Sequence, residues 1–116
     1  MNYNIFILGT VRNVEKTIIK DVKAIKKFTE KFRKTQLCLL ESDSNDRTIE
    51  LLSNLEDQDS NFNFITLGKL KGKYPLRTER LAFCRNKLLS WLKQYELSAN
   101  TLVVVADFDG VNTNID

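Results

Sequence analysis

Hydrophobic positions along the chain change their spacing several times, and each change marks a predicted element. Val14, Ile18, Val22, Ile25 and Phe28 recur three or four residues apart with Lys and Glu between them, which is typical of an amphipathic helix. Short apolar runs bounded by polar residues, such as TLVVVA, indicate strands instead. The pattern predicts strands over Tyr3–Gly9, Gln36–Glu41, Phe62–Leu67 and Thr101–Ala106, and helices over 14–33, 48–56 and 77–95.

Strands that alternate with helices predict an α/β fold with a mostly parallel, Rossmann-like sheet in the order β-α-β-α-β-α-β. We expect the last strand to be covered on both faces, because it is a continuous apolar run. Ligands of such sheets bind outside the carboxyl ends of the strands. Four loops therefore merit inspection, namely Thr10–Asn13, Ser42–Asp46, Gly68–Thr78 and Asp107–Asn112.

Composition narrows the chemistry that these loops can perform. The 116 residues contain no histidine, which excludes a Ser-His-Asp triad, a histidine base and a histidine-ligated metal. Cys38 and Cys84 lie in apolar patterns, so we expect buried free thiols in a reducing compartment. A metal would need oxygen ligands, which favours Mg²⁺, Mn²⁺ or Ca²⁺.

The distribution of charge and apolar residues bears on partners and location. The net charge is +3, and residues 12–34 carry nine basic and three acidic groups. We interpret this basic block as a solvated helix face and expect no nucleic-acid partner, because aromatic residues are not interleaved with it. No apolar run approaches a membrane span, and the first eight residues do not resemble a secretory signal. The chain is therefore expected to lack a transmembrane segment and to be cytoplasmic.

The first two loops carry polar side chains without a recognised phosphate motif. Thr10, Arg12 and Asn13 follow the first strand, with neither G-x-G-x-x-G nor G-K-[ST], so they either bind a ligand or serve as turn residues. Glu41 and the residues after it offer carboxylates that could accept the hydroxyls of a ribose. Alternatively, Asp43 or Ser44 caps the following helix.

The third predicted helix places arginines near its apolar stripe. At about 100° per residue, Arg77 shares the side of Leu81 and Cys84, and Arg85 lies at the edge of that side. A guanidinium group directed toward the core needs an anion. Its partner is either a carboxylate of the protein, such as Glu41 or Asp107, or a phosphate.

The fourth loop begins with Asp107-Phe108-Asp109, directly after an apolar strand. Alternate side chains of an extended segment share a face, so the two carboxylates would point the same way. Two carboxylates at the open end of a sheet suit a hard divalent cation, with water and phosphate oxygens as further ligands. The alternative is a charged strand end that holds no metal.

Taken in order, these segments resemble the nucleotide-binding half of a GT-A-fold nucleotide-sugar glycosyltransferase. The matching segments are IFILGTVRN, CLLESDSNDRTIELL, RTERLAFCRNKLL and VVVADFDGVN. The capsule-associated and fungal Golgi mannosyltransferase families show a similar arrangement, with an E-S-x-S-x-D-x-T turn, an arginine-rich helix and an acidic metal motif after a strand.

The resemblance implies a role for each of these loops. Thr10, Arg12 and the Glu41–Asp43 stretch, with Ser42, would contact the nucleoside and ribose, and Asn13 and Asp107 are further candidates. Arg77, Arg80 and Arg85 would face the diphosphate or the sugar. Asp107 and Asp109 would hold Mn²⁺ or Mg²⁺. The donor would be a UDP- or GDP-linked sugar and the acceptor a glycan or a lipid-linked glycan, in polysaccharide synthesis.

In the families that it resembles, the acceptor-binding half follows the metal motif, and this sequence stops at Asp116. We therefore expect residues 1–116 to form the nucleotide-sugar-binding half of a GT-A domain, apparently truncated. Catalysis would then require the missing half or a second chain, and the catalytic residues cannot be assigned.

Two other functions are alternatives to the glycosyltransferase. VVVADFDGVNTN also resembles the first motif of haloacid-dehalogenase-type phosphatases, in which the first Asp is the nucleophile, although the later motifs of that family have no counterpart here. The other alternative is a non-catalytic α/β nucleotide-binding module.

Overall fold

The computed structural model describes residues 2–106 and 108, and that part of the chain contains every predicted element in the predicted order. The strands and helices alternate throughout, as the change of hydrophobic spacing indicated. Their bounds are β1 Asn4–Val11, α1 Ile18–Thr29, β2 Lys34–Glu41, α2 Thr48–Gln58, β3 Phe62–Thr66, α3 Arg77–Leu92 and β4 Thr101–Val105.

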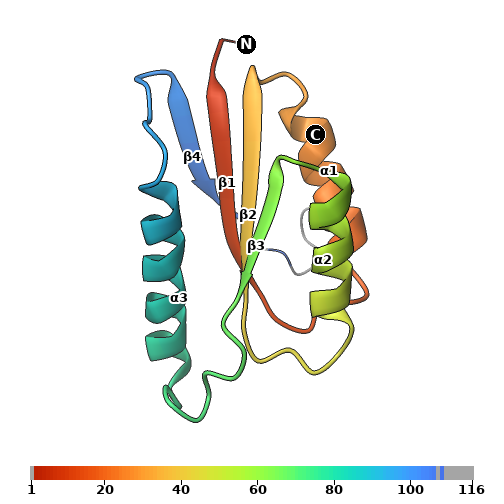
Figure 1. The fold of residues 1–116 in the computed structure, drawn as a ribbon, viewed down its shortest axis with the longest axis vertical. Coiled ribbons are helices and arrows are strands. Elements are labelled where there is room, and N and C mark those ends of the chain that lie inside the picture. The colour runs from red at the N-terminus through yellow and green to blue at the C-terminus, as the bar shows by residue number, and fades with distance from the viewer. Residues whose placement is uncertain (1, 107, 109–116) are drawn as a thin grey trace.

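The strands of the described residues form one all-parallel sheet in the order β3-β2-β1-β4 (Figure 1). The chain thus proceeds outward from β1 to β3 and then crosses to the other side of β1. The predicted α/β class with a parallel, Rossmann-like sheet is confirmed. Because all strands point the same way, their carboxyl ends gather at one edge of the sheet, and the order reverses between β1 and β4.

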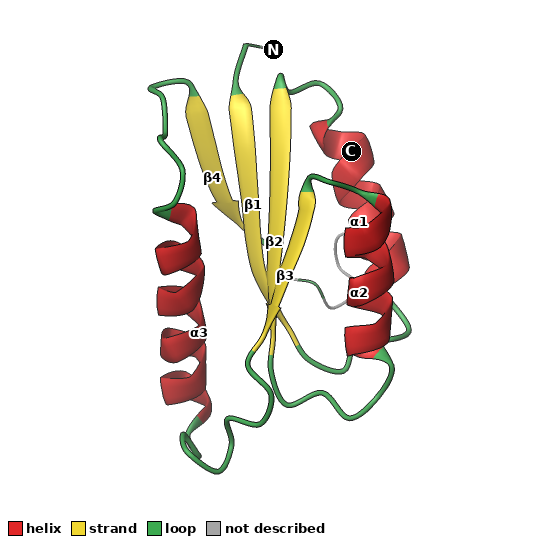
Figure 2. Cartoon of the chain, in the orientation of Figure 1, coloured by secondary structure: helices red, strands yellow, loops and turns green. Residues whose placement is uncertain are grey.

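Two helical layers enclose the sheet, with α1 and α2 on one face and α3 on the other (Figure 2). Alternation along β1 explains this arrangement, since Ile5 and Ile7 pack toward α1 and α2, whereas Phe6 and Leu8 pack toward α3. The same alternation divides β2. Both central strands are therefore buried on both faces, as is expected for parallel strands.

Helix α1 is shorter than the predicted span of 14–33, because tertiary contacts occupy its first turn. The N–H of Val14 donates to Oγ1 of Thr48 at 2.8 Å, and the carbonyl of Val14 accepts from Thr17 and Ile18. Val14 is buried although it precedes the helix. The apolar spacing therefore extended the predicted helix into a turn that is not helical. Helix α3 likewise ends at Leu92 rather than at Tyr95.

The expectation that the last strand would be covered on both faces was wrong for the described residues. Strand β4 is at the edge of the sheet, beyond the helices, and Leu102 to Val105 are all exposed, Val105 at 65%. A continuous apolar run shows that a strand has no polar face, but it does not determine whether helices cover that strand.

Candidate functional site

A pocket of about 510 Å³ opens at the carboxyl ends of β1 and β2 and is closed on one side by the first half of α3. It lies where parallel sheets bind ligands. Residues from several elements line it, namely Thr10, Val11, Arg12, Val14, Ser42, Asp43, Arg77, Arg80, Leu81, Cys84, Arg85 and Phe108. The structure thus brings together seven of the predicted site residues: Thr10, Arg12, Ser42, Asp43, Arg77, Arg80 and Arg85.

A larger cavity, of about 770 Å³, lies at the opposite edge of the sheet. It is lined by strand starts, including Asn4, Lys34 and Thr101. We assign the candidate site to the smaller pocket, because the loops that follow parallel strands carry the polar groups that bind ligands.

Guanidinium groups dominate the electrostatics of the pocket. Arg12 comes from the loop after β1, and Arg77, Arg80 and Arg85 come from α3. Asp43 is the one carboxylate among the described lining residues. Such an excess of positive charge is suited to an anion, and guanidinium groups bind phosphates with paired hydrogen bonds.

The prediction that Arg77 and Arg85 point into the core was wrong, since both are exposed. Helix α3 buries Cys84, Leu88 and Leu92, and its first turns extend to the level of the carboxyl ends of the strands (Figure 1). The arginine side of those turns therefore meets the pocket and not the sheet.

Arg80 is held differently from its neighbours. It is half-buried, and its Nη1 donates to the carbonyls of Tyr74 and Pro75 at 3.0 and 2.7 Å. These bonds fix the end of the loop before α3. Arg80 therefore positions the basic loop, residues 68–75, as well as adding charge to the pocket.

Asp43 connects the loop after β2 to the basic loop. Its Oδ1 accepts hydrogen bonds from the N–H groups of Leu70 and Lys71, and its own N–H donates to Gly68. Partial burial acts to raise the pKa of Asp43, but the bonds from Lys71 and Leu70 and the charge of Arg80 outweigh it and lower the pKa below its ordinary value. Among the described residues, Oδ2 of Asp43 is buried and has no hydrogen-bond partner.

The backbone of Asp43 has φ of 58°, a left-handed conformation that Asp and Asn adopt more readily than most residues. Gly68, which receives its N–H, has φ of 66° in the turn after β3. The two left-handed residues bring the loops within hydrogen-bonding distance. Neither Asp43 nor Ser44 caps α2, since Thr48 N–H instead donates to Oδ1 of Asp46 at 2.9 Å.

Glu41 lies beneath the pocket rather than in it, contrary to the expectation that it contacts a nucleoside. The side chain is 0% exposed, its Oε1 accepts from Oγ1 of Thr66, and its Oε2 accepts from the N–H of Ser44 at 2.8 Å. Both oxygens are therefore engaged within the protein. Glu41 joins the end of β3 to the turn after β2, which positions the neighbouring Ser42 and Asp43.

Asn13 also serves the loops and is not among the residues that line the pocket. Its N–H donates to Oγ of Ser44 at 3.0 Å, and its Oδ1 accepts from the N–H of Asn45 at 2.8 Å. The loop after β1 and the loop after β2 are thereby linked through both backbone and side chain. This link determines where Arg12 leaves the end of β1.

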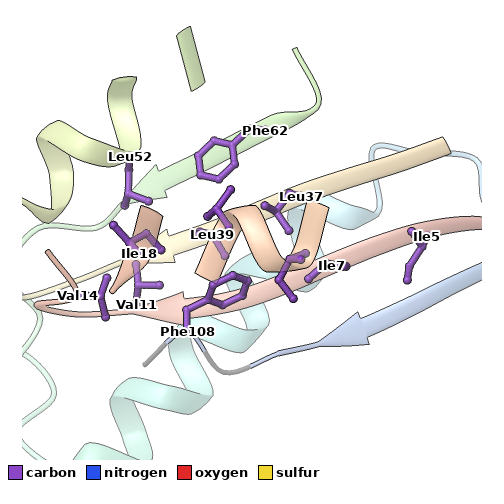
Figure 3. Packing of buried hydrophobic residues seen from close by; sticks show 12 residues of the cluster. Ile5, Ile7, Val11, Val14, Ile18, Leu37, Leu39, Leu52, Phe62 and Phe108 are labelled. Atoms are coloured by element: carbon purple, nitrogen blue, oxygen red, sulfur yellow. The ribbon is translucent and has the colours of Figure 1, made fainter. Parts of the chain in front are cut away.

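Phe108 forms part of the floor of the pocket and was not predicted as a site residue. Its ring is buried with Ile7, Val11 and Ile18, as Figure 3 shows. The sequence contained a signal for this, because Phe108 is an apolar residue between polar neighbours directly after an apolar strand, and such alternation favours the core side for the apolar residue. Gly9 leaves room for the ring, since a Cβ there would lie 2.7 Å from two of its carbons.

The two cysteines are buried free thiols, as predicted. Burial, with a contribution from the charge of Glu56, raises the pKa of Cys38 to about 12. Burial also raises the pKa of Cys84, which lines the pocket, despite a hydrogen bond with Ser42. Both thiols therefore stay protonated near neutral pH and are poor nucleophiles.

The predicted metal ligands Asp107 and Asp109 lie outside the described residues. Within the described residues, no group of three or more Cys, Asp or Glu side chains is placed to hold a metal ion. Asp43 offers one oxygen without a protein partner, Oδ2, which is fewer than a hard cation requires.

No protein-family model matches the chain, and no curated protein matches it either. Within the described residues, each helix is too short or too polar to span a bilayer.

Proposed function

We propose that the pocket binds the diphosphate of a nucleoside-diphosphate sugar, and that the chain is the donor-binding part of a metal-dependent glycosyltransferase. The observation that carries the proposal is the convergence of Arg12, Arg77, Arg80 and Arg85 on one cavity at the carboxyl edge of a parallel sheet. The cavity volume is within the range of small-molecule sites.

Different residues of the pocket would bind different parts of the ligand. The exposed guanidinium groups of Arg77 and Arg85 would pair with phosphate oxygens, and they would stabilise the negative charge that develops on the departing nucleoside diphosphate. Thr10, Ser42 and the unpaired Oδ2 of Asp43 offer hydrogen-bonding groups to ribose hydroxyls or a base.

A divalent cation, Mn²⁺ or Mg²⁺, belongs to this proposal through Asp107 and Asp109, which follow β4 in the sequence. When bound, such a cation would neutralise charge on the diphosphate. The acceptor, a glycan or a lipid-linked glycan, and the expected cytoplasmic location also remain parts of the proposal.

Calorimetric titration of the 116-residue chain with UDP and GDP, with and without Mn²⁺, tests the proposal. We expect binding that requires Mn²⁺, and we expect Arg77→Gln and Arg85→Gln each to weaken it by about tenfold, since each removes a charge-assisted bond. Arg33→Gln is a matched control, because Arg33 is exposed and lines the cavity at the opposite edge.

Other results would favour the alternatives. Tight binding without Mn²⁺ would indicate a non-catalytic nucleotide-binding module, and an aspartyl-phosphate or beryllofluoride adduct on Asp107 would indicate the phosphatase. Absence of binding at millimolar concentration, or an equal loss in Arg33→Gln, would contradict the assignment of the pocket.

A further inference from the structure

The side of α1 that faces away from the sheet carries a row of lysines. Lys20, Lys23 and Lys27 lie on α1, Lys16 lies in the turn before it, and all four are exposed. At about 100° and 1.5 Å per residue, Lys20, Lys23 and Lys27 fall within an arc of about 60° and along about 10 Å of α1, opposite the side that packs on the sheet. Lys16 precedes them in the turn before the helix. We call these four residues the lysine stripe.

Within the described residues, no salt bridge compensates the positive charge of the stripe. Among the described residues, the salt bridges join Lys26 to Asp59 at 2.7 Å and Arg47 to Glu50 at 3.0 Å, and they involve no lysine of the stripe. Asp21, an acidic residue of α1, is fully buried on the side of the helix that faces the sheet. The stripe therefore presents four adjacent ammonium groups to solvent.

From this charge pattern we propose that the lysine stripe docks the protein on an anionic phospholipid surface. A row of ammonium groups along one helix matches a plane of negative headgroups, and lysine attracts such a plane without needing a fixed bonding geometry. Ile19 borders the stripe and is 36% exposed, so it can enter the interfacial region. The inference does not depend on what the arginine pocket binds.

The surroundings of the stripe favour a bilayer over a nucleic acid. The exposed residues of α1 are Ile19, Lys20, Lys23 and Lys27, so this helix presents no exposed arginine, asparagine or glutamine to read base edges and no exposed aromatic residue on which bases stack. The neighbouring helix α2 indicates how the protein would be oriented on a bilayer, because it exposes three acidic residues, Glu50, Glu56 and Asp57. A negative surface therefore approaches the protein from the side of α1 and leaves α2 in water.

Sedimentation with vesicles tests the proposal. The full chain should bind vesicles of phosphatidylcholine with about one third phosphatidylserine, should ignore vesicles of phosphatidylcholine alone, and should be released by salt. Each lysine near such a surface contributes about a fivefold factor, so K16Q/K20Q/K23Q/K27Q should reduce partitioning by more than about 100-fold. Glutamine is a good helix former, and circular dichroism checks that the variant is folded.

A second quadruple variant controls for net charge. K69Q/K71Q/K87Q/K93Q removes four exposed lysines from other parts of the surface and should retain most of the binding. A fluorophore attached to Ile19→Cys should shift to the blue on vesicles, whereas one on Ile49→Cys in α2 should not. Cys38 and Cys84 are buried, and labelling of the parent protein checks whether either thiol competes for the label.

Four results would overturn the proposal. They are equal binding to both kinds of vesicle, equal loss in the two quadruple variants, a blue shift at Ile49 as large as that at Ile19, and tighter binding to an oligonucleotide than to the anionic vesicles.

Discussion

Gly9 shows how closely the strand ends are packed beneath the candidate site. A Cβ at this position would lie 2.7 Å from Phe108 and 2.8 Å from the carbonyl oxygen of Ala106. The carbonyl belongs to the backbone that leaves β4, so it cannot move without disturbing the pairing with β1. Glycine is therefore required here by space and not by backbone conformation.

We expect Gly9→Ala to lower the free energy of unfolding by about 1–3 kcal/mol, as overpacking of a well-filled core does. Urea denaturation followed by circular dichroism measures the change. Gly72→Ala is the matched control, since a Cβ there would have no neighbour within 4 Å. Equal stability of Gly9→Ala and the parent protein would contradict the packing of Phe108 against β1.

The buried carboxylate of Glu41 can be tested by a single substitution. Both of its carboxylate oxygens accept hydrogen bonds in a fully buried position, and Glu41→Leu removes both acceptors. We expect a loss of about 1–3 kcal/mol, because the N–H of Ser44 is left without an acceptor. Chemical denaturation measures it, and Glu79→Leu, at an exposed position, should have almost no effect. A Glu41→Leu protein as stable as the parent would contradict the structural role of Glu41.

At the scale of elements, α1 and α2 are joined at their starts by the loops that precede them. Besides the bonds of Asn13, the N–H of Val14 donates to Thr48, and the N–H of Glu15 donates to Oδ2 of Asp46 at 3.3 Å. These bonds cross more than thirty positions of the sequence. They explain why the first turn of the predicted helix became part of a loop junction.

Thr48→Val should break this junction at its buried point. The substitution keeps the shape of the side chain and leaves the N–H of Val14 without an acceptor, which costs about 1–3 kcal/mol. Thr48→Ser keeps the hydroxyl group and should restore most of the stability. Thermal unfolding compares the three proteins, and a Thr48→Ser protein as unstable as Thr48→Val would assign the loss to packing instead.

Asp46 gives the junction a dependence on pH. Partial burial acts to raise the pKa of Asp46, but hydrogen bonds from Thr48 and from the N–H of Glu15 outweigh it, so the pKa is lowered. A lowered pKa stabilises the fold at pH values above the unfolded pKa, about 4, and this stability is lost as the pH falls through the folded pKa.

Asp46→Asn should therefore be less stable than the parent protein near pH 7, by about 0.5–1 kcal/mol because the site is exposed. The difference should vanish at the lowest pH values, where the carboxyl group is protonated in both states. Urea denaturation at a series of pH values measures it. A difference that is constant with pH would show that ionisation of Asp46 does not matter.

At the scale of the whole molecule, local patterns and long-range contacts determine different features. Hydrophobic spacing predicted every element of the described residues and the parallel sheet, because each helix buries one side at a spacing of three or four residues and the central strands are short apolar runs. It also indicated the edge at which Arg12, Asp43 and the arginines of α3 meet. Hydrophobic spacing could not predict which site residues are exposed and which are buried, because this depends on how far one element extends past another. Arg77 is exposed because α3 extends beyond the core, and Glu41 is buried because Thr66 reaches it from β3.

The uncovered β4 strand has a consequence for the behaviour of the molecule in solution. Leu102 to Val105 are exposed on both faces of an edge strand that contains no charge, proline or glycine, the features with which proteins usually protect such edges. In the described residues, Ala106 donates to Leu8 of β1, so Val103 and Val105, which alternate with it, direct their backbone groups to the open edge.

We therefore expect the chain to self-associate as its concentration rises, and V103K/V105K to reduce this severalfold without lowering stability, since both valines are exposed. Static light scattering over a concentration series measures the association, and urea denaturation measures the stability. Leu89→Lys is the matched control, because Leu89 is exposed on α3 away from any strand edge. Scattering that is unchanged in V103K/V105K, or reduced equally by Leu89→Lys, would show that the edge of β4 is not what brings the molecules together.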